Sequence, residues 1–261
     1  SHGGLALLLQ RLPGLVMTHA LNDSLILQLC QLGLNAAFGA PAVPMQDAGM
    51  GVVVAVFGEY SAYRSVVLGD VLDARLVASN VRRARRTYVL PDGGKVQAFS
   101  ALALLLLQSA PSIPSEAAGP SLLDSADKRA STASLYTESP AKSERAHPYQ
   151  RDVADSAKQL VRALASRCLE RTDDAEAKAL LDDFVRDSLV LLGRPEWPAA
   201  ALCMQLASAL FCRKLAVRKE RGFDAKEQAT RVFALELLGK ILETVAEQRR
   251  PSSARMFHTV P

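Results

Sequence analysis

Apolar residues recur at helical spacing through the second half of the chain. Four stripes follow one another: Val153, Ala157, Leu160, Val161, Leu164 and Cys168; Leu180, Leu181, Phe184, Val185, Leu189 and Leu192; Leu202, Leu206, Ala209 and Leu210; Val232, Leu235, Leu238, Leu242 and Val245. A period of three to four residues places each stripe on one buried face of a helix. The pattern therefore predicts four antiparallel helices, and stacked hairpins of this kind form an α-solenoid.

A proline-rich turn separates the second and third of these helices. Within Leu180–Ala201 the apolar run stops at Gly193, and Pro195-Glu196-Trp197-Pro198 follows at once. Pro198 suits the first turn of a helix, where its missing N–H costs nothing. Trp197, the only tryptophan, can fold its ring onto the apolar face of the helix that it precedes. We predict a structural hinge of Pro195, Trp197 and Pro198, and favour packing over a ligand or DNA contact for Trp197.

The first half is less regular. Val52–Phe57 is β-branched enough to indicate a strand, but no alternating partner strand lies nearby and the family resemblance given below places a helix there. We therefore predict a helix and an all-α fold without a sheet. Asp92-Gly93-Gly94 marks a turn before a helix that starts at Lys95. Pro111–Pro148 is rich in Ser, Ala, Pro and charge, which predicts a disordered loop. The predicted organisation is helical repeats over 1–110, this loop over 111–148, helical repeats over 149–248 and a tail over 249–261.

Capping residues mark two of the predicted helix starts. Asp224 and Glu227 have the spacing of a capping box, and Thr172-Asp173-Asp174 precedes the second stripe. Paired carboxylates at Asp173-Asp174 and Asp182-Asp183 lie near a helix start, where the helix dipole favours them. A structural role is therefore preferred over acid–base catalysis for both pairs.

Composition supports helices and excludes several classes of site. The chain is 49% hydrophobic but only 5% aromatic, and Ala and Leu, both strong helix formers, dominate. The four cysteines form no CxxC pair and lie in apolar stretches, which predicts buried, reduced thiols in an intracellular protein: Cys30, Cys168, Cys203 and Cys212. The histidines show no metal-ligand spacing.

Other sequence signals are absent. No Gly-rich phosphate loop, HExxH or GxSxG motif occurs, so we expect neither an enzyme nor a cofactor. The longest apolar run, Ala98–Leu107, is too short to cross a bilayer, and we expect no membrane partner. Ser1–Leu12 lacks a basic segment and an initiator Met, and is interpreted as the edge of a longer protein.

A cluster of arginines is the functional candidate that the residues themselves suggest. The net charge is only +4, but Arg82, Arg83, Arg85 and Arg86 fall within five positions, with Arg75 upstream. If the segment is helical, Arg75, Arg82 and Arg86 share a face, where guanidinium groups suit contacts to DNA phosphates. Asn80 and Tyr88 could add hydrogen bonds. A solvated face, a contact to acidic residues and a nuclear-localisation signal remain alternatives.

Several motifs together resemble one family. Asp183-Phe184-Val185, then Leu189–Leu192, then Pro195–Ala200 resembles the hinge of the cohesin-loading Nipped-B (adherin, delangin) family. Further segments resemble the family in order, so that the likeness spans residues 18 to 247: Leu21–Phe38 (a Leu-rich helix ending in a Leu-Gly turn and a Phe), Val53–Leu72, the basic Arg75–Arg86, Gln97–Pro111 and Thr230–Val245. Leu202-Cys203-Met204 departs from the family pattern, which has an acidic residue and leucines there.

The resemblance carries its own implications. It implies an internal segment of a hook-shaped HEAT-repeat protein of nuclear chromatin, without catalytic residues of its own. Such a protein binds DNA and the cohesin complex, SMC heads and kleisin included, stimulates its ATPase and promotes its loading for sister chromatid cohesion, with consequences for transcription and DNA repair. A TPR-type partner would bind an N-terminal region that this chain lacks. The alternatives are a generic HEAT or armadillo scaffold and, more remotely, a helical-bundle enzyme.

Overall fold

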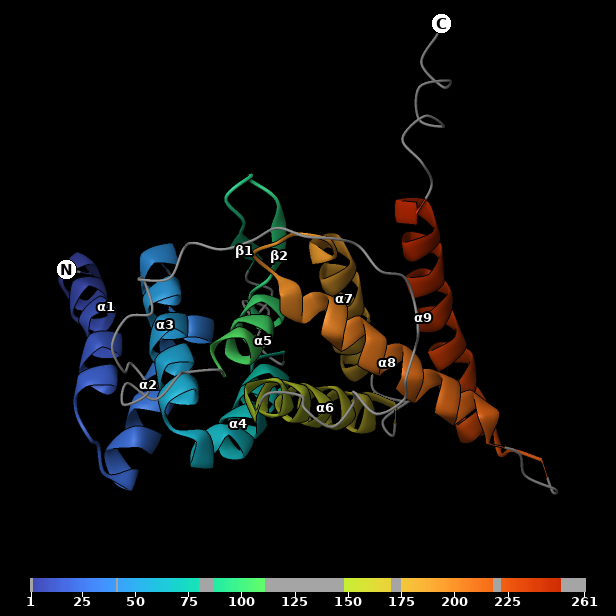
Figure 1. Cartoon of the computed structure of the whole chain (residues 1–261), viewed down its shortest axis with the longest axis horizontal. Helices are drawn as coiled ribbons and strands as arrows, with labels where there is room; N and C mark the ends of the chain where they lie inside the picture. The colour runs from blue at the N-terminus through green and yellow to red at the C-terminus, as the bar shows by residue number, and fades with distance from the viewer. Residues whose placement is uncertain are drawn as a thin grey trace, which may run out of the picture.

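The chain folds almost wholly into helices, as the sequence predicts. A computed structural model describes residues 2–40, 42–79, 87–110, 148–169, 175–217 and 222–249. These ranges hold nine α-helices, a short 3₁₀ helix and two strands (Figure 1): α1 His2–Thr18, α2 Asp23–Gly39, α3 Val43–Glu59, η1 Ser61–Tyr63, α4 Arg64–Ser79, β1 Thr87–Val89, β2 Lys95–Gln97, α5 Ala98–Ser109, α6 Pro148–Leu169, α7 Ala175–Leu191, α8 Pro198–Ala216 and α9 Ala225–Arg249.

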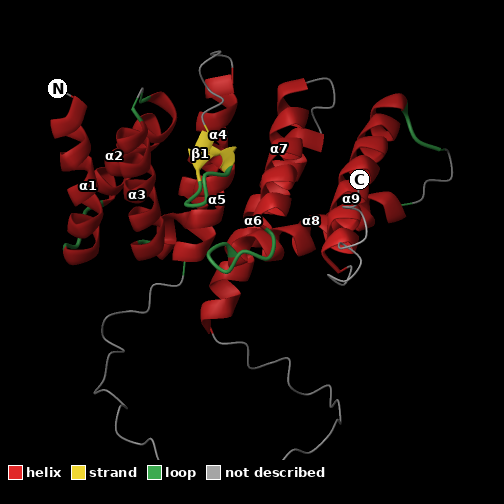
Figure 2. Ribbon diagram, turned by 90° about the horizontal axis from the view of Figure 1, so that it is seen from above, coloured by secondary structure: helices red, strands yellow, loops and turns green. Residues whose placement is uncertain are grey.

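The helices form a row along the long axis of the molecule. Figure 2 shows α1 at one end of the row and α9 at the other, with the remaining helices stacked between them. Helix α3 packs against α2 and α1, and helix α8 packs against α6 and α9. Neighbouring helices thus cover each other's apolar faces, which is how an array of helical hairpins builds one continuous core.

The β-branched run Val52–Phe57 lies within helix α3 and does not form a strand. Val52, Val53 and Phe57 are completely buried, because α3 lies between α1, α2 and α5. A helix that is covered on several sides needs apolar residues all round, so a β-branched run here indicates burial and not a strand. The prediction of a helix over Val52–Phe57 is confirmed.

Two glycines bring α2 and α3 into close contact. A Cβ atom on Gly33 would lie 2.9 Å from the carbonyl oxygen of Gly49, and a Cβ atom on Gly49 would lie 2.6 Å from that of Gly33. Helix α2 continues through Gly33 to Gly39. The prediction of a Leu-Gly turn before Phe38 is therefore wrong. Gly33 is required for helix packing, because only a residue without a side chain lets the backbones approach this far.

A β-hairpin corrects the prediction that the chain contains no sheet. β1 and β2 pair antiparallel, with Thr87 opposite Gln97, and helix α5 begins only at Ala98, not at Lys95. Leu90 and Gly94 close the loop through a 2.8 Å hydrogen bond from the Leu90 N–H to the Gly94 carbonyl. Gly93 has φ of +83°, the left-handed conformation that such a short hairpin loop requires. The turn signal at Asp92-Gly93-Gly94 therefore closes a hairpin and does not start a helix.

Helix α9 buries a different face from the one predicted. Val232, Leu235 and Leu242 are 51%, 59% and 61% exposed, whereas the other two predicted residues, Leu238 and Val245, are half-buried. The buried residues of the helix are Thr230, Ala234, Leu237 and Ile241. Both sets have helical spacing, so periodicity alone could not decide which one the neighbouring helices α7 and α8 cover.

Three of the four cysteine thiols are buried and one is exposed. Cys30, Cys168 and Cys203 are buried, whereas Cys212 near the end of α8 is exposed, which corrects the prediction that all four are buried. Burial raises the pKa of both Cys30 and Cys203 to about 12, and the carboxylate of Asp70 adds to the effect at Cys30. These two side chains therefore stay protonated and pack as small apolar groups.

Some predictions concern residues that the structure does not describe. The expected loop over 111–148 lies outside the described residues except for Pro148, the first residue of α6, and so does the tail over 249–261 except for Arg249. Thr172, Asp173 and Asp174 are also outside. At the start of α9 the predicted cap is confirmed, because the Glu227 N–H donates a 2.7 Å hydrogen bond to Asp224 Oδ1.

Candidate functional site

The arginine cluster falls between α4 and β1. Arg82, Arg83, Arg85 and Arg86 lie outside the described residues, as does Asn80. Arg75 belongs to the last turns of α4 by its backbone, and its side chain is not described. The common face of Arg75, Arg82 and Arg86 therefore stays a prediction. What the structure does place are the two flanks of the segment, the end of α4 and the start of the hairpin.

The hairpin flank is anchored to the hinge through Tyr88. The rings of Tyr88 and Trp197 meet edge to face, with centroids 6.1 Å apart and planes at 78°. Burial, with a smaller contribution from Asp47, raises the pKa of Tyr88, which keeps its phenol neutral. Tyr88 thus packs against the hinge. The sequence suggested only that its hydroxyl could donate a hydrogen bond to phosphate.

The structure places Trp197 inside the molecule. Its side chain is only 6% exposed, and its carbonyl accepts a hydrogen bond from the Ala200 N–H, as in the first turn of a helix. Pro198 follows as the first residue of α8, while Pro195 remains exposed. Helix α5 holds the same turn from the other side, since Gln108 Nε2 donates a 2.8 Å hydrogen bond to the Glu196 carbonyl. The hinge is thus a junction of α5, α8 and the hairpin.

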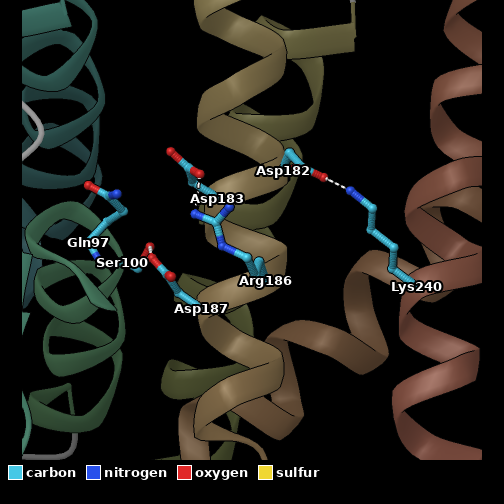
Figure 3. A network of polar contacts seen from close by, with 7 residues as sticks. All are labelled: Gln97, Ser100, Asp182, Asp183, Arg186, Asp187 and Lys240. Carbon is cyan, nitrogen blue, oxygen red and sulfur yellow. Dashed lines mark hydrogen bonds and ion pairs between the residues drawn. The ribbon is translucent and has the colours of Figure 1, made fainter. Parts of the chain in front are cut away.

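Asp187 on α7 is a buried carboxylate that sequence reasoning missed. Figure 3 shows it directed at the start of α5, where its Oδ2 accepts hydrogen bonds from the Gln97 N–H (2.9 Å) and from Ser100 Oγ (2.7 Å). The side chain is 4% exposed, and burial raises its pKa although the two hydrogen bonds oppose the shift. Asp187 therefore caps α5 from a different helix. The sequence did contain a signal for this buried role, because Asp187 is an acidic residue within the apolar stripe of the helix.

Two neighbouring carboxylates of α7 are half-buried and form ion pairs. Asp182 forms an ion pair with Lys240 of α9, and Asp183 pairs with Arg186 one turn along α7 (Figure 3). Because α7 begins at Ala175, both aspartates lie in the interior of the helix and not near its start, which corrects the capping interpretation. Their contacts are structural, and none brings two carboxylates together on a shared site.

The described residues include no metal site. Within those ranges, no group of three or more His, Cys, Asp or Glu side chains is arranged to hold a metal ion. One shallow hollow lies between α6 and α8, and another lies at the start of α9.

Helix α8 is long and apolar enough to cross a membrane, and α3 with the bent segment after it meets the same test as a pair. This is weak evidence for a span, since the core helix of a soluble protein has the same length and composition. Buried residues of α8 pack in the core, and they are Ala199, Ala200, Cys203, Met204, Ala207 and Phe211. In this fold α8 packs against α5, α6, α7 and α9.

Comparison with known proteins identifies similar sequences. No protein-family model matches the chain. The chain is 25% identical to the Nipped-B-like protein of Mus musculus over 88% of its own length, and 26% identical to Nipped-B-like protein B of Danio rerio over 90%. The Nipped-B protein of Drosophila melanogaster is 25% identical over 90% of the chain. The chain spans only 8% of the mouse and zebrafish proteins and 11% of the fly protein. The resemblance that the hinge motif indicates is therefore confirmed: the chain is similar to a small part of the Nipped-B-like proteins over about nine tenths of its length.

Proposed function

We propose that this chain is a segment of a Nipped-B-type cohesin loader, a helical-repeat protein of nuclear chromatin that promotes loading of cohesin onto DNA. The observation that carries the proposal is the similarity to Nipped-B-like proteins of several animals across almost the whole chain. The row of stacked helices supports it, because extended helical arrays offer long surfaces to large partners.

In this proposal the chain contributes surface and not catalysis. The buried carboxylate Asp187 caps a helix, and Asp182 and Asp183 of the same helix form ion pairs. Stimulation of the cohesin ATPase would then act through contacts with the SMC heads and kleisin, while the ATPase residues belong to cohesin itself. The TPR-type partner would bind elsewhere in the longer protein, and α8 would serve as a core helix without a membrane partner.

The DNA contact is assigned to Arg75, Arg82, Arg83, Arg85 and Arg86. Their density suits the phosphate backbone, which makes binding independent of sequence and strongly dependent on salt. The hairpin packed on Trp197 supports this assignment, because it fixes one end of the arginine segment to the rigid part of the molecule.

Co-precipitation of the full-length protein with cohesin tests the proposed function. We expect SMC and kleisin subunits to be recovered from chromatin extracts, and recovery to drop when the region matching this chain is deleted. A generic HEAT or armadillo scaffold would instead recover other complexes and leave cohesin behind. Loss of cohesin loading on DNA in a purified reaction is the second readout, and an unchanged loading rate would contradict the proposal.

Salt-dependent DNA binding tests the arginine assignment separately. Replacing the five arginines with glutamine should flatten the slope of log affinity against log salt by about 0.9 for each phosphate that the protein no longer neutralises. Binding should weaken equally on unrelated duplexes, because backbone contacts carry no sequence information. A control variant, in which the exposed Lys226 and Arg11 are replaced with glutamine, should retain the slope. An unchanged slope in the five-arginine variant would assign the cluster to solvent or to a protein partner.

A further inference from the structure

Helices α6 and α8 form a groove whose floor is apolar. The two helices pack side by side, and the floor between them consists of Val161 from α6 with Leu206 and Leu210 from α8. Val161 is buried and the two leucines are half-buried. The groove encloses about 160 Å³, and an apolar cavity of about 150 Å³ accommodates one aromatic ring. One large apolar side chain therefore fits.

The rim of this groove carries only positive charge. Lys158 and Arg162 line it from α6, and Arg213 lines it from α8. Arg162 and Arg213 are exposed, and among the described residues no carboxylate forms an ion pair with either of them. Lys158 pairs with Asp155 at 2.9 Å on the solvent side of α6. Two guanidinium groups thus border an apolar floor without an acidic partner from the described part of the molecule.

We propose that this α6–α8 groove binds an amphipathic helix with acidic flanks from a partner protein. A helix that binds in this way presents apolar residues at positions i, i+3 or i+4 and i+7, one of which would fill the groove. The groove repeats this spacing on α8, where Leu206, Leu210 and Arg213 follow one another at intervals of four and three residues. Glutamate or aspartate beside the inserted residues would meet Arg162 and Arg213 from opposite walls.

The apolar floor decides between a protein and a nucleic acid. Phosphate contacts require cations but gain nothing from leucine side chains beneath them. An amphipathic helix uses both features, since the inserted side chain is removed from water and its neighbours find opposite charges. The inference stands independently of cohesin loading, because it rests on the composition of the groove alone.

Binding of a designed peptide to the full chain tests this inference. The probe is a fluorescein-labelled peptide of about 18 residues, long enough to be helical, with leucines at i, i+3 and i+7 and glutamates beside them. Two comparison peptides keep one feature each: the first replaces the leucines with serine, and the second replaces the glutamates with lysine. We expect the first probe to bind and both comparison peptides to bind at least about ten-fold more weakly.

Three variants locate the site on the groove. Arg162→Glu with Arg213→Glu should raise the Kd of the acidic peptide by about ten-fold or more, because attraction becomes repulsion on both walls. Ala209→Trp, at an exposed position of α8, should fill the groove and weaken binding without any change of charge. The control is Arg11→Glu with Lys226→Glu, which changes the net charge equally at exposed positions on α1 and α9 and should leave the Kd unchanged.

Several outcomes would overturn the inference. Equal weakening by the control variant, or equal binding of the serine peptide, would mean that net charge alone attracts the probe. Tighter binding of a duplex oligonucleotide that is abolished in the Arg162→Glu, Arg213→Glu variant would identify a nucleic-acid surface. A dimer in sedimentation that the same variant abolishes would identify a second copy of the chain as the occupant.

Discussion

The first five helices and the last four bury their apolar residues in different ways. In α1–α5 the central helices are covered on several sides, and α5 buries Ala101, Leu102 and Leu104 completely. In α6–α9 the helices keep exposed outer sides, and α9 leaves Leu235 and Leu242 exposed. A helix in the middle of a stack thus needs an apolar surface all round, whereas a helix with one covered side shows a clear stripe.

The two halves also differ in what closes the helix ends. Arg64 donates to the carbonyls of Phe57, Gly58 and Ala110, so that one guanidinium caps α3 and the end of α5 together. Arg231 donates to the carbonyls of Lys214, Leu215 and Val217 at the end of α8 alone. The first arginine links two helices to α4, and the second links only α8 to α9. We therefore expect substitutions in the first half to cost more than matching ones in the second half.

The largest effect is expected at the junction of the halves. Trp197→Ala should lower the free energy of unfolding by about 3 kcal/mol, because it removes a buried ring that packs on Tyr88. Urea unfolding followed by circular dichroism measures the change. Trp197→Phe should recover part of the loss, since it restores some of the buried surface. Unchanged stability in the alanine variant would mean that the two halves are joined elsewhere.

The glycine contact is expected to be next in size. Gly49→Ala should cost about 2 to 3 kcal/mol, because its Cβ would lie 2.6 Å from the Gly33 carbonyl oxygen and neither backbone can yield. Gly239→Ala on α9 is the matched control, because nothing lies within 4 Å of its Cβ. That control should gain about 0.5 to 1 kcal/mol from helix propensity. Equal effects of the two substitutions would contradict the expectation that substitutions cost more in the first half than in the second.

The two capping arginines allow a direct comparison. Arg64→Ala should cost about 2 kcal/mol, because three carbonyls at two helix ends lose a charged donor. Arg231→Ala should cost about 1 kcal/mol, since water can replace its contacts at the exposed end of α8. Thermal unfolding of both variants beside their lysine counterparts separates charge from the forked geometry of arginine. The reverse order of losses would contradict the proposed ranking.

The smallest effect is a pH dependence at Asp187. Burial raises its pKa in the folded state above the ordinary 3.8, so the folded protein holds the proton more tightly than the unfolded chain. The stability contributed by protonated Asp187 is therefore present at low pH and is lost as the pH rises through the folded-state pKa. Asp187→Asn should become more stable relative to the wild type as the pH rises above the ordinary carboxyl pKa of 3.8. Parallel stability profiles of the two proteins would exclude this coupling.

Local chemistry in the sequence was enough to predict the starts of α8 and α9. Asp224 and Glu227 predicted a capped start for α9, and Pro198 predicted the start of α8, because such signals act within one helical turn. The motifs around Trp197 also indicated the similarity to Nipped-B-like proteins. These features depend on residues close together in the chain, so the sequence alone determines them.

Contacts between distant segments were decided by the tertiary structure. The buried face of α9, the role of Gly33 and the capping of α5 by Asp187 each depend on a neighbour that sequence spacing does not specify. Two apolar stripes compete on α9, and only the position of α7 and α8 selects Leu237 and Ile241 over Leu235 and Leu242. The groove of α6 and α8 likewise exists only where two helices meet. Periodicity determines that a helix has an apolar face, while packing determines which face is buried.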